Sequence, residues 1–415
     1  MLELRKRLSK KIVRGELLMK FFHTADWHLG KLVQGIYMTE DQAYILQQFI
    51  KAIEDEKPDA VIIAGDLYDR AVPPTEAVYL LDEVLNTIVM QLKTPVLAIG
   101  GNHDSPGRLN FGNQMMRDNG LHIIGRFTKE HNPVILHDQH GEIHFHLIPY
   151  VDPSIVRNVF EDDDIRTHND AAKKIVDHIT SKMDKDARHV FVGHAFVTPH
   201  GAEEENTSDS ERPLSIGGAE YVSAEHYSNF DYTALGHLHQ AHHVSNEKIR
   251  YAGSILKYSI SEENHKKGFH IVEMAEDGSV SIIKRDLIPR RDMRTVEGKL
   301  EEILTHPVNE DYVFIRLTDE TPILSPMEKV RSVYPNAMHV ERENYFLSSG
   351  LDQGEESKER NKMSDVELFN SFYQEVKGIK ATDETETIFK DVLEEILVDD
   401  NESSQSKRKL EYTSK

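Results

Sequence analysis

Five short stretches of the chain gather side chains that bind divalent metal ions. They supply carboxylates, imidazoles and one amide, which are oxygen and nitrogen donors for a borderline-hard cation. Each stretch follows a run of apolar residues, so each is expected where a strand ends. In chain order they are TADWHLGK with Asp26 and His28, AGDLYDR with Asp66, Asp69 and Arg70, GGNHDS with Asn102, His103 and Asp104, VGHAF with His194, and LGHLHQ with His237 and His239.

The spacing inside two stretches predicts that neighbouring donors face the same way. Asp26 and His28 are two residues apart, as are His237 and His239. In an extended backbone residues i and i+2 point to one side, so both members of a pair can reach one ion. A glycine precedes four of the donors and is expected to let the backbone turn sharply there. These glycines are Gly65, Gly101, Gly193 and Gly236.

This ordered set resembles the motifs of the calcineurin-like metallophosphoesterases: D-x-H, G-D-x-x-D, G-N-H-D, G-H and G-H-x-H. The resemblance runs from Met19 to Asp286 with every motif intact. It implies a two-metal site in a β-sandwich flanked by helices. It further implies that Asp26, His28, Asp66 and His239 hold one ion, and that Asp66 bridges to a second ion held by Asn102, His194 and His237.

The chemistry of such a site agrees with these residue types. Two neighbouring ions can activate a water molecule and stabilise phosphate oxygens during in-line attack. A carboxylate such as Asp66 can bridge two cations while neutralising part of their charge. Mixed oxygen and nitrogen ligation favours manganese, with iron, zinc and magnesium as alternatives.

The remaining polar residues of these stretches have other expected roles. The resemblance places His103 beside the phosphate as proton donor to the leaving oxygen, against the alternative of a buried structural histidine. Asp104 is expected to orient His103 or to cap the following turn. Asp69 and Arg70 are expected to form a buried ion pair that braces their loop. The other histidines near or between the stretches are expected to be ordinary polar residues: His23, His122, His144, His146, His200, His242 and His243.

The elements around the five stretches alternate between strand and helix, which predicts an α/β fold. Helical periodicity appears near 41–56, 75–92 and 169–183, with strand-like runs between them. Residues 269–287 predict a hairpin that turns at Asp277 and Gly278. The predicted architecture is a metallophosphoesterase β-sandwich flanked by helices, with a small α+β cap and a C-terminal helix pair.

Composition divides the chain into six segments. Residues 1–18 form a basic extension, and Met19 is an alternative start of the natural chain. An α/β domain spans 19–286. A smaller unit spans 291–347, with helices at 296–304 and 326–334 and strands at 312–317 and 337–342. The polar linker, the helix pair and the polar tail span 348–363, 364–397 and 398–415.

Charge and cysteine content narrow the functional class. The formal net charge is −22, and such a surface repels polyanions on average. That argues against a passive nucleic-acid coat protein but leaves DNA open as a substrate. One basic cluster, IIKRDLIPRRDMR, is either a local DNA-binding patch or a solvated linker. The absence of cysteine excludes disulfides, thiolate metal sites and cysteine nucleophiles, and fits a reducing cytoplasm.

Three further stretches resemble the SbcD family, the nuclease subunits of bacterial SbcCD complexes, most closely in Gram-positive forms. They are HTADWHLGK, EDQAYILQQFI and TSDSERPLSIGGAEYV. The resemblance implies a manganese-dependent 3′–5′ exonuclease on double-stranded DNA with endonuclease action on hairpins and single strands. It also implies that 19–286 is a nuclease domain and that 291–347 is a DNA-binding cap. The implied assembly is a cytoplasmic homodimer within a heterotetramer with the SbcC ATPase, acting in DNA repair, recombination and replication.

Two functions of other classes remain open. A stand-alone metallophosphatase or nucleotidase would hydrolyse small phosphoesters and would need neither a cap nor a helix pair. A non-enzymatic scaffold would be indicated by the loss of a metal ligand, and no ligand is lost.

The C-terminal helix pair predicts a docking element. Ser364 and Glu367 form a capping box, and Asp383 with Glu386 forms a second capping pattern. Two short helices behind a polar linker bury many large apolar groups poorly by themselves, so a partner surface is favoured over packing on the main domain. The SbcD resemblance implies the base of the SbcC coiled coil. The two apolar stripes are Val366, Phe369, Phe372, Tyr373 and Val376, and Ile388, Phe389, Val392, Leu393 and Ile396.

Overall fold

A computed structural model describes residues 18–201, 208–211, 220–319 and 321–342, with further residues scattered between 366 and 392. Two compact units divide the chain. The first holds residues up to 317 and 323–341, and the second holds 318–322 and the residues from 342 onward. Three expected segments lie outside the described residues: the extension up to residue 17, the linker and the polar tail. Several positions of the helix pair also lie outside them, among them Ser364, Glu367, Phe372, Val376, Asp383, Leu393 and Ile396.

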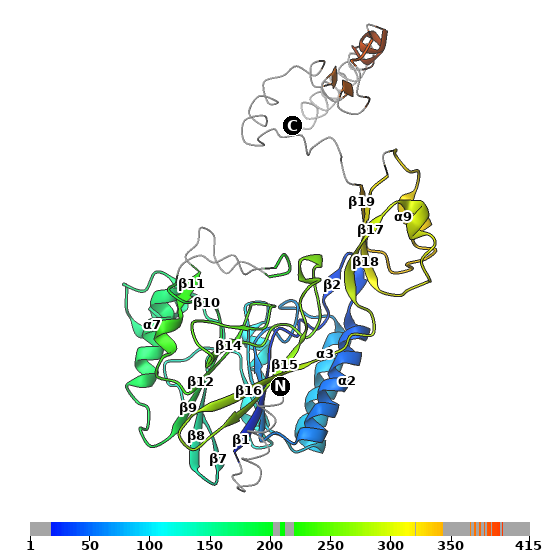
Figure 1. The fold of residues 1–415 in the computed structure, drawn as a ribbon. Helices are drawn as coiled ribbons and strands as arrows, with labels where there is room; N and C mark the ends of the chain where they lie inside the picture. Colours follow the sequence, from blue (N-terminus) through cyan, green and yellow to red (C-terminus); the bar gives the residue numbers. More distant parts are fainter. Residues whose placement is uncertain are drawn as a thin grey trace, which may run out of the picture. The chain divides into compact units, whose positions relative to one another are not determined.

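Two six-stranded sheets form a sandwich (Figure 1), with the strand orders β16-β15-β1-β4-β5-β6 and β13-β14-β12-β9-β8-β7. The inner strands of each sheet are parallel, and antiparallel strands close the edges β15-β16, β13 and β7. The first sheet comprises β1 (Met19–Thr24), β4 (Ala60–Ala64), β5 (Val96–Ile99), β6 (Leu121–Ile124), β15 (Gly268–Met274) and β16 (Val280–Asp286). The second comprises β7 (Val134–Asp138), β8 (Gly141–Leu147), β9 (Arg188–His194), β12 (Tyr232–Gly236), β13 (His242–His243) and β14 (Ile249–Tyr251). Short two-stranded ribbons join β2 (Leu32–Val33) to β3 (Ile36–Tyr37) and β10 (Phe196–Thr198) to β11 (Tyr221–Ser223).

Alternation along the strands creates the layers. In β1, Phe21 faces the other sheet and lies 5.6 Å from the rings of both Phe145 and Tyr232. Its neighbour Phe22 joins the core on the opposite face, with Phe49. Successive strand residues point to opposite faces, so apolar residues at every position bury both sides of the sheet. The sheets therefore need helices on their outer faces.

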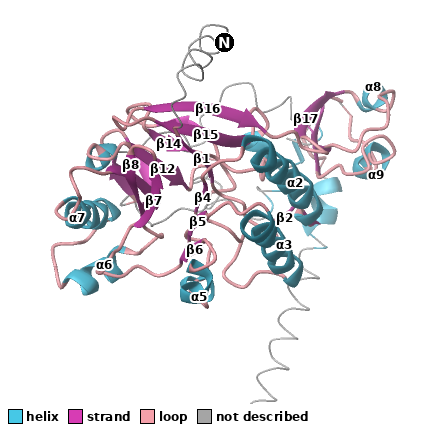
Figure 2. Cartoon of the chain, turned by 90° about the horizontal axis from the view of Figure 1, so that it is seen from below, coloured by secondary structure: helices cyan, strands magenta, loops and turns pink. Residues whose placement is uncertain are grey.

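Helices cover both outer faces (Figure 2). On the first sheet lie α2 (Thr39–Glu56) and α3 (Thr75–Asn86), and α3 continues as a π-helical turn, Thr87–Gln91. On the second lie α6 (Pro153–Phe160) and α7 (His168–Thr180). Two short helices, α4 (Pro106–Leu109) and α5 (Asn113–Arg117), follow β5. The three predicted helices and the hairpin at Gly278 are confirmed, with small shifts at their ends.

The cap is a three-stranded sheet with its own apolar core. One prediction is wrong here: 296–304 is not one helix, because its first residues extend strand β17 and only a single turn, α8, is helical. Parallel pairing with β18 over its whole length outweighs the local helical pattern. The elements are β17 (Met293–Gly298), α8 (Leu300–Ile303), β18 (Tyr312–Leu317), α9 (Pro326–Val330) and β19 (His339–Arg342).

The basic cluster at residues 282–294 is paired with acidic side chains, although Arg285, Arg290 and Arg294 stay partly exposed. Arg291 lies 3.2 Å from the buried carboxylate of Asp41 in α2, and Arg290 lies 3.3 Å from Glu40. The Tyr312 hydroxyl of the cap also donates to Asp41, at 2.5 Å. The remaining members are likewise paired: Lys284 with Asp286, Arg285 with Glu56 and Arg294 with Asp311. The ion pairs of Arg290 and Arg291, with the Tyr312 bond, fasten the start of the cap to α2.

Three histidines outside the five stretches make structural contacts. His23 is buried and bonded to the Tyr232 hydroxyl at 2.9 Å, and His146 lies 3.0 Å from a ring nitrogen of His189. His242 stacks on Tyr251 in the short edge strand β13. In the part of the chain that the structure describes, no helix is long and apolar enough to cross a membrane.

Candidate metal centre

The first donors stand where two adjacent strands end. Asp26 and Asp66 lie two residues beyond β1 and β4, and both side chains are buried. The backbone is left-handed, with φ of 53° at Asp26, 45° at His28 and 51° at Asp66. Asp26 N–H donates to the Gly65 carbonyl at 3.1 Å, and His28 N–H donates to the Asp66 carbonyl at 2.9 Å. The prediction of an extended Asp26–His28 segment is therefore wrong, because these inter-loop bonds hold an unfavourable conformation.

The other sheet brings its histidines to the same end of the sandwich. His194 is the last residue of β9 and pairs with Gly236, the last residue of β12. His237 follows with φ of 111°, so the His237–His239 pair does not share an extended backbone either. The His237 N–H donates to the Asp26 carboxylate at 3.0 Å. A loop of one sheet is thereby bonded to a strand end of the other.

Six of the seven predicted ligands offer ligand atoms that lie close together. Possible ligand atoms of Asp26, His28 and His239 lie within 4.8 Å of one another, as do those of Asp26, Asp66 and His194. The amide oxygen of Asn102 lies 2.9 Å from His194 Nε2.

Asp66 lies between the two groups, since its Oδ2 is 3.6 Å from His28 Nε2 and 3.3 Å from His194 Nε2. Asp26 belongs to both groups. The ring of His237 lies 5.4 Å from that of His194, outside both. The bridging role of Asp66 and the division of ligands between two ions stay predictions.

The charge of this cluster suits divalent cations. Burial raises the pKa of Asp26 to about 7. Burial alone would lower the pKa of His194, but the adjacent Asp66 carboxylate raises it to about 9. His194 in turn holds the pKa of Asp66 well below its usual range. Burial lowers the pKa of His28, so its ring is neutral and able to bind a metal. Buried carboxylates that need nearby positive charge, the neutral ring of His28 and a His194 proton that a cation can replace fit divalent metal ions.

Backbone carbonyls fix the orientation of two rings. Because a carbonyl only accepts, His194 Nδ1 must donate to the Ala64 carbonyl, 2.9 Å away, which leaves Nε2 as the metal-binding atom. His103 Nδ1 likewise donates to the Asp69 carbonyl at 2.7 Å, so its Nε2 is the atom left for a substrate. His103 is half-buried, whereas His28 and His194 are buried.

Asp104 joins two loops of the site. Its carboxylate accepts the N–H groups of Leu67, Tyr68 and Gly101 at 2.9–3.0 Å. None of these donors belongs to the turn that follows Asp104 or to the His103 ring, so the bonds match neither of the two roles expected from the sequence. A direct catalytic role for Asp104 stays a prediction.

The expected buried pair of Asp69 and Arg70 is wrong. Arg70 is half exposed and its Nη2 lies 3.9 Å from the Asp69 carboxylate. Lys31 instead reaches Asp69 at 2.8 Å, with both side chains largely buried. Asp69 also forms a possible ligand group with His28 and His103. The loop is therefore braced from the neighbouring strand-end loop.

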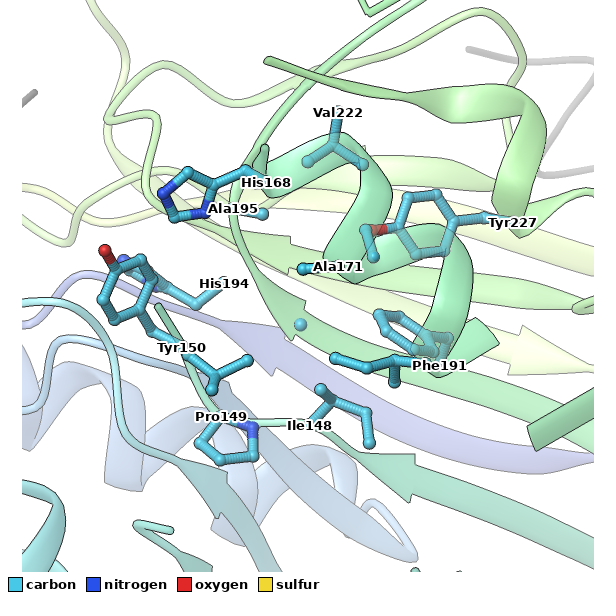
Figure 3. Close-up of a pocket in the computed structure, with 14 residues that line it drawn as sticks. Ile148, Pro149, Tyr150, His168, Ala171, Phe191, His194, Ala195, Val222 and Tyr227 are labelled. Atoms are coloured by element: carbon cyan, nitrogen blue, oxygen red, sulfur yellow. The ribbon is translucent and has the colours of Figure 1, made fainter. Parts of the chain in front are cut away.

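An apolar hollow of about 50 Å³ borders the His194 side of the cluster (Figure 3). Ile148, Phe191 and Tyr227 line it, and the Tyr150 ring stacks on His168 at 5.8 Å. These apolar groups keep His194 out of water on that side, which strengthens its interaction with Asp66.

Four buried or half-buried polar residues near His239 were not identified from the sequence: Ser210, Glu211, Glu262 and Lys267. Two of them, Ser210 and Glu211, lie inside TSDSERPLSIGGAEYV, so the resemblance of that stretch was a usable signal. The other two follow β14 in a segment that has no recognisable motif. Residues 212–219 lie outside the described part of the chain.

Comparison with known proteins gives two matching family models. Residues 19–241 match the family model described as calcineurin-like phosphoesterase, and residues 289–377 match one described as Type 5 capsule protein repressor C-terminal domain. Two solved structures are similar with TM-scores of 0.36: the protein TT1561 of Thermus thermophilus (10% identity, 65% of this chain, 99% of that one) and a dimetal phosphatase from Danio rerio (12%, 66% and 98%).

The first model covers more than half of the chain, and the chain is a calcineurin-like phosphoesterase. A curated relative, the D subunit of the SbcCD nuclease of Staphylococcus epidermidis, is 35% identical over 360 residues, which are 86% of this chain and 93% of that protein. Within the phosphoesterases, the chain belongs to the SbcD family. The resemblance and fold class predicted from the sequence are confirmed.

Glycines at the site are needed mainly because a side chain there would clash with a neighbouring loop or strand. Gly65 has a positive φ of 95°, as the sequence predicted. A Cβ on Gly101 would lie 2.1 Å from Asp66 Oδ1, and one on Gly236 would lie 1.9 Å from the Ala64 carbonyl oxygen. At these positions the absent side chain, rather than a sharp turn, lets the loops approach.

Gly101→Ala is expected to displace Asp66 and so to weaken metal binding, which titration calorimetry with Mn²⁺ measures. The rate of phosphodiester hydrolysis is expected to fall on the order of 10²-fold. Gly107→Ala in the same segment is the matched control, because its Cβ would meet only the flexible end of Arg126. Normal Mn²⁺ affinity in Gly101→Ala would show that Asp66 does not bind metal from this position.

Proposed function

We propose that the chain is a manganese-dependent DNA nuclease subunit that acts with an SbcC-type ATPase in DNA repair, recombination and replication. Its proposed activities are 3′–5′ exonuclease on double-stranded DNA and endonuclease on hairpins and single strands. The observation that carries this proposal is the buried cluster of carboxylates and imidazoles at one end of the sandwich. Similarity to a nuclease subunit along nearly its whole length supports a nucleic acid as the substrate, and DNA is the one we propose.

The proposed ligands are those expected from the motifs. Asp26, His28, Asp66 and His239 hold one ion, and Asp66, Asn102, His194 and His237 hold the other. When bound, such ions supply charge that stabilises phosphate oxygens and a water molecule activated for in-line attack. The protein's part is to hold the donors in a buried, braced cluster, because charge interactions are strongest where water is excluded.

His103 is proposed to give a proton to the leaving oxygen. Protonated on both nitrogens, the ring can release the Nε2 proton. The neutral ring that remains carries its proton on Nδ1, and the Asp69 carbonyl, 2.7 Å from Nδ1, accepts that N–H. The bond therefore stabilises the tautomer that is formed after transfer.

The proposed assembly is a cytoplasmic homodimer bound to two ATPase subunits. The name of the curated relative describes it as one subunit of a complex. In this chain, the described residues of the helix pair contact each other: Phe369 stacks on Phe389 at 4.0 Å, and Asn370 donates to Glu386 at 3.1 Å. Ile388 and Val392, four residues apart, stay 61% and 50% exposed. They provide an apolar face for a partner helix.

A nuclease assay tests the function. The purified chain with Mn²⁺ is expected to cleave linear and hairpin DNA, with and without the ATPase partner, and Asp66→Asn is expected to abolish cleavage because the cluster loses a negative charge facing the cations. His242→Ala is the control and should be close to silent. Cleavage of only a small chromogenic phosphoester, with DNA untouched, would favour the stand-alone phosphatase.

His103→Ala is expected to separate turnover from metal binding. Loss of a general acid lowers the rate roughly 10²–10⁴-fold, while two Mn²⁺ ions should still bind with affinities near those of the wild type in calorimetry. If metal affinity fell as far as activity, His103 would be a ligand, in line with its proximity to His28 and Asp69.

Ile388→Asp with Val392→Asp is expected to abolish co-purification with the ATPase partner and to leave basal nuclease activity intact, because burying a carboxylate in an apolar contact is costly. Deletion of 364–397 should do the same. Thr387→Asp, which adds one carboxylate to the same helix next to Ile388, is the control. Phe369 is a poorer target, since a charge there would break its stacking within the pair. Undiminished partner binding by the double variant would exclude this face.

A further inference from the structure

His239 is held from several directions by side chains that are not among the proposed ligands. Glu262 Oε1 lies 3.0 Å from the ring atom Nδ1. Glu211 accepts the backbone N–H of His239 at 2.6 Å, and Lys267 Nζ donates to its backbone carbonyl at 2.9 Å. The hydroxyl of Ser210 lies 2.7 Å from Nδ1 as well.

Glu262 and Lys267 form a buried ion pair at the centre of this set. Lys267 Nζ lies 2.5 Å from Glu262 Oε2, with side-chain exposures of 6% and 0%. Lys267 also donates to the Ser254 hydroxyl at 2.8 Å, and Glu262 accepts from Ser208 and from the Tyr258 N–H. A buried ion pair persists only where further hydrogen bonds satisfy both charges, and these contacts do so. The Glu262 carboxylate is therefore fixed in place and ionised.

We propose that Glu262 is a positioning residue that fixes the ring orientation and tautomer of His239 for metal binding. An ionised carboxylate only accepts, and the Ser210 hydroxyl donates to the same Glu262 oxygen, so His239 Nδ1 carries the proton. Nε2 is then left with its lone pair, and it lies 3.1 Å from His28 Nε2, on the side of the Asp26 group. Carboxylates in this arrangement also make the histidine a stronger ligand. The proposal rests on the proposed role of His239 as a ligand.

The turn that carries Glu262 is anchored on its far side to the cap. Glu262 ends a short 3₁₀ turn, η3 (Ile260–Glu262). The adjacent Glu263 accepts the N–H of Thr295 in β17 at 2.8 Å, and Lys257 bonds both the Glu263 carbonyl, at 2.6 Å, and the Met293 carbonyl, at 3.1 Å. The Asp209 N–H donates to Ser261 at 3.0 Å. The carboxylate that orients His239 is thus held by the cap strand and by the 208–211 segment together.

The test is calorimetric titration of the full chain with Mn²⁺, with circular dichroism to verify folding. Glu262→Gln keeps the shape of the side chain but removes its charge, and leaves Lys267 buried without a counter-charge. The second variant, Glu262→Gln with Lys267→Met, removes both charges and avoids that cost. Both are expected to weaken binding of one ion about 10–100-fold and to leave the other ion largely unaffected.

The matched control is Glu142→Gln. Glu142 lies 2.7 Å from His144 Nε2 in another carboxylate–histidine pair, outside the metal centre, so its variant should bind both ions normally. Wild-type affinity for both ions in a folded Glu262 variant would overturn the proposal. His239→Ala separates the two levels of inference: if it also leaves both affinities unchanged, the ligand assignment is wrong, whereas a loss there alone refutes only the role of Glu262.

Discussion

The structure depends on the burial of two carboxylates, Asp26 and Asp66, in adjacent loops at one end of a β-sandwich. Two negative charges at this depth are unstable unless positive charge or hydrogen bonds surround them. His194 and the backbone N–H groups of His237 and His103 supply part of that stabilisation. The rest of the fold can be understood as the means by which strands from both sheets bring such partners to one point.

That requirement explains the unusual backbone of the site. Asp26, His28, Asp66 and His237 have positive φ, which costs non-glycine residues free energy. The cost is tolerated because the loops are cross-linked, as in the 3.1 Å bond from Asp26 to the Gly65 carbonyl. Small residues complete the arrangement, since a side chain at Gly101 or Gly236 would overlap a neighbouring loop or strand. Loop strain, hydrogen bonding and glycine placement thus form a single constraint.

The sequence could predict which residues gather, but not how their backbones are arranged. Apolar runs and the motif order located every donor at a strand end, because strand pattern and loop chemistry are local signals. The left-handed φ of Asp26 depends on a bond to Gly65, which is 39 positions away, and no local pattern encodes it. Glu262 was missed for the same reason, since its partners His239 and Lys267 meet it only in the folded chain. Residues 296–298, the end of strand β17, were taken for helix because pairing with β18, not propensity, decides their conformation.

An acidic chain that acts on a polyanion must overcome charge repulsion. With a net charge of −22, the surface repels DNA on average. The basic cluster before the cap does not offset this, because Arg290, Arg291 and Arg294 are each paired with a carboxylate. Lys31, close to the site, is likewise paired with Asp69. Divalent ions at the proposed centre would supply positive charge at the reacting phosphodiester itself, so the residues proposed to hold them, Glu262 included, would bear on substrate binding as well as on the reaction.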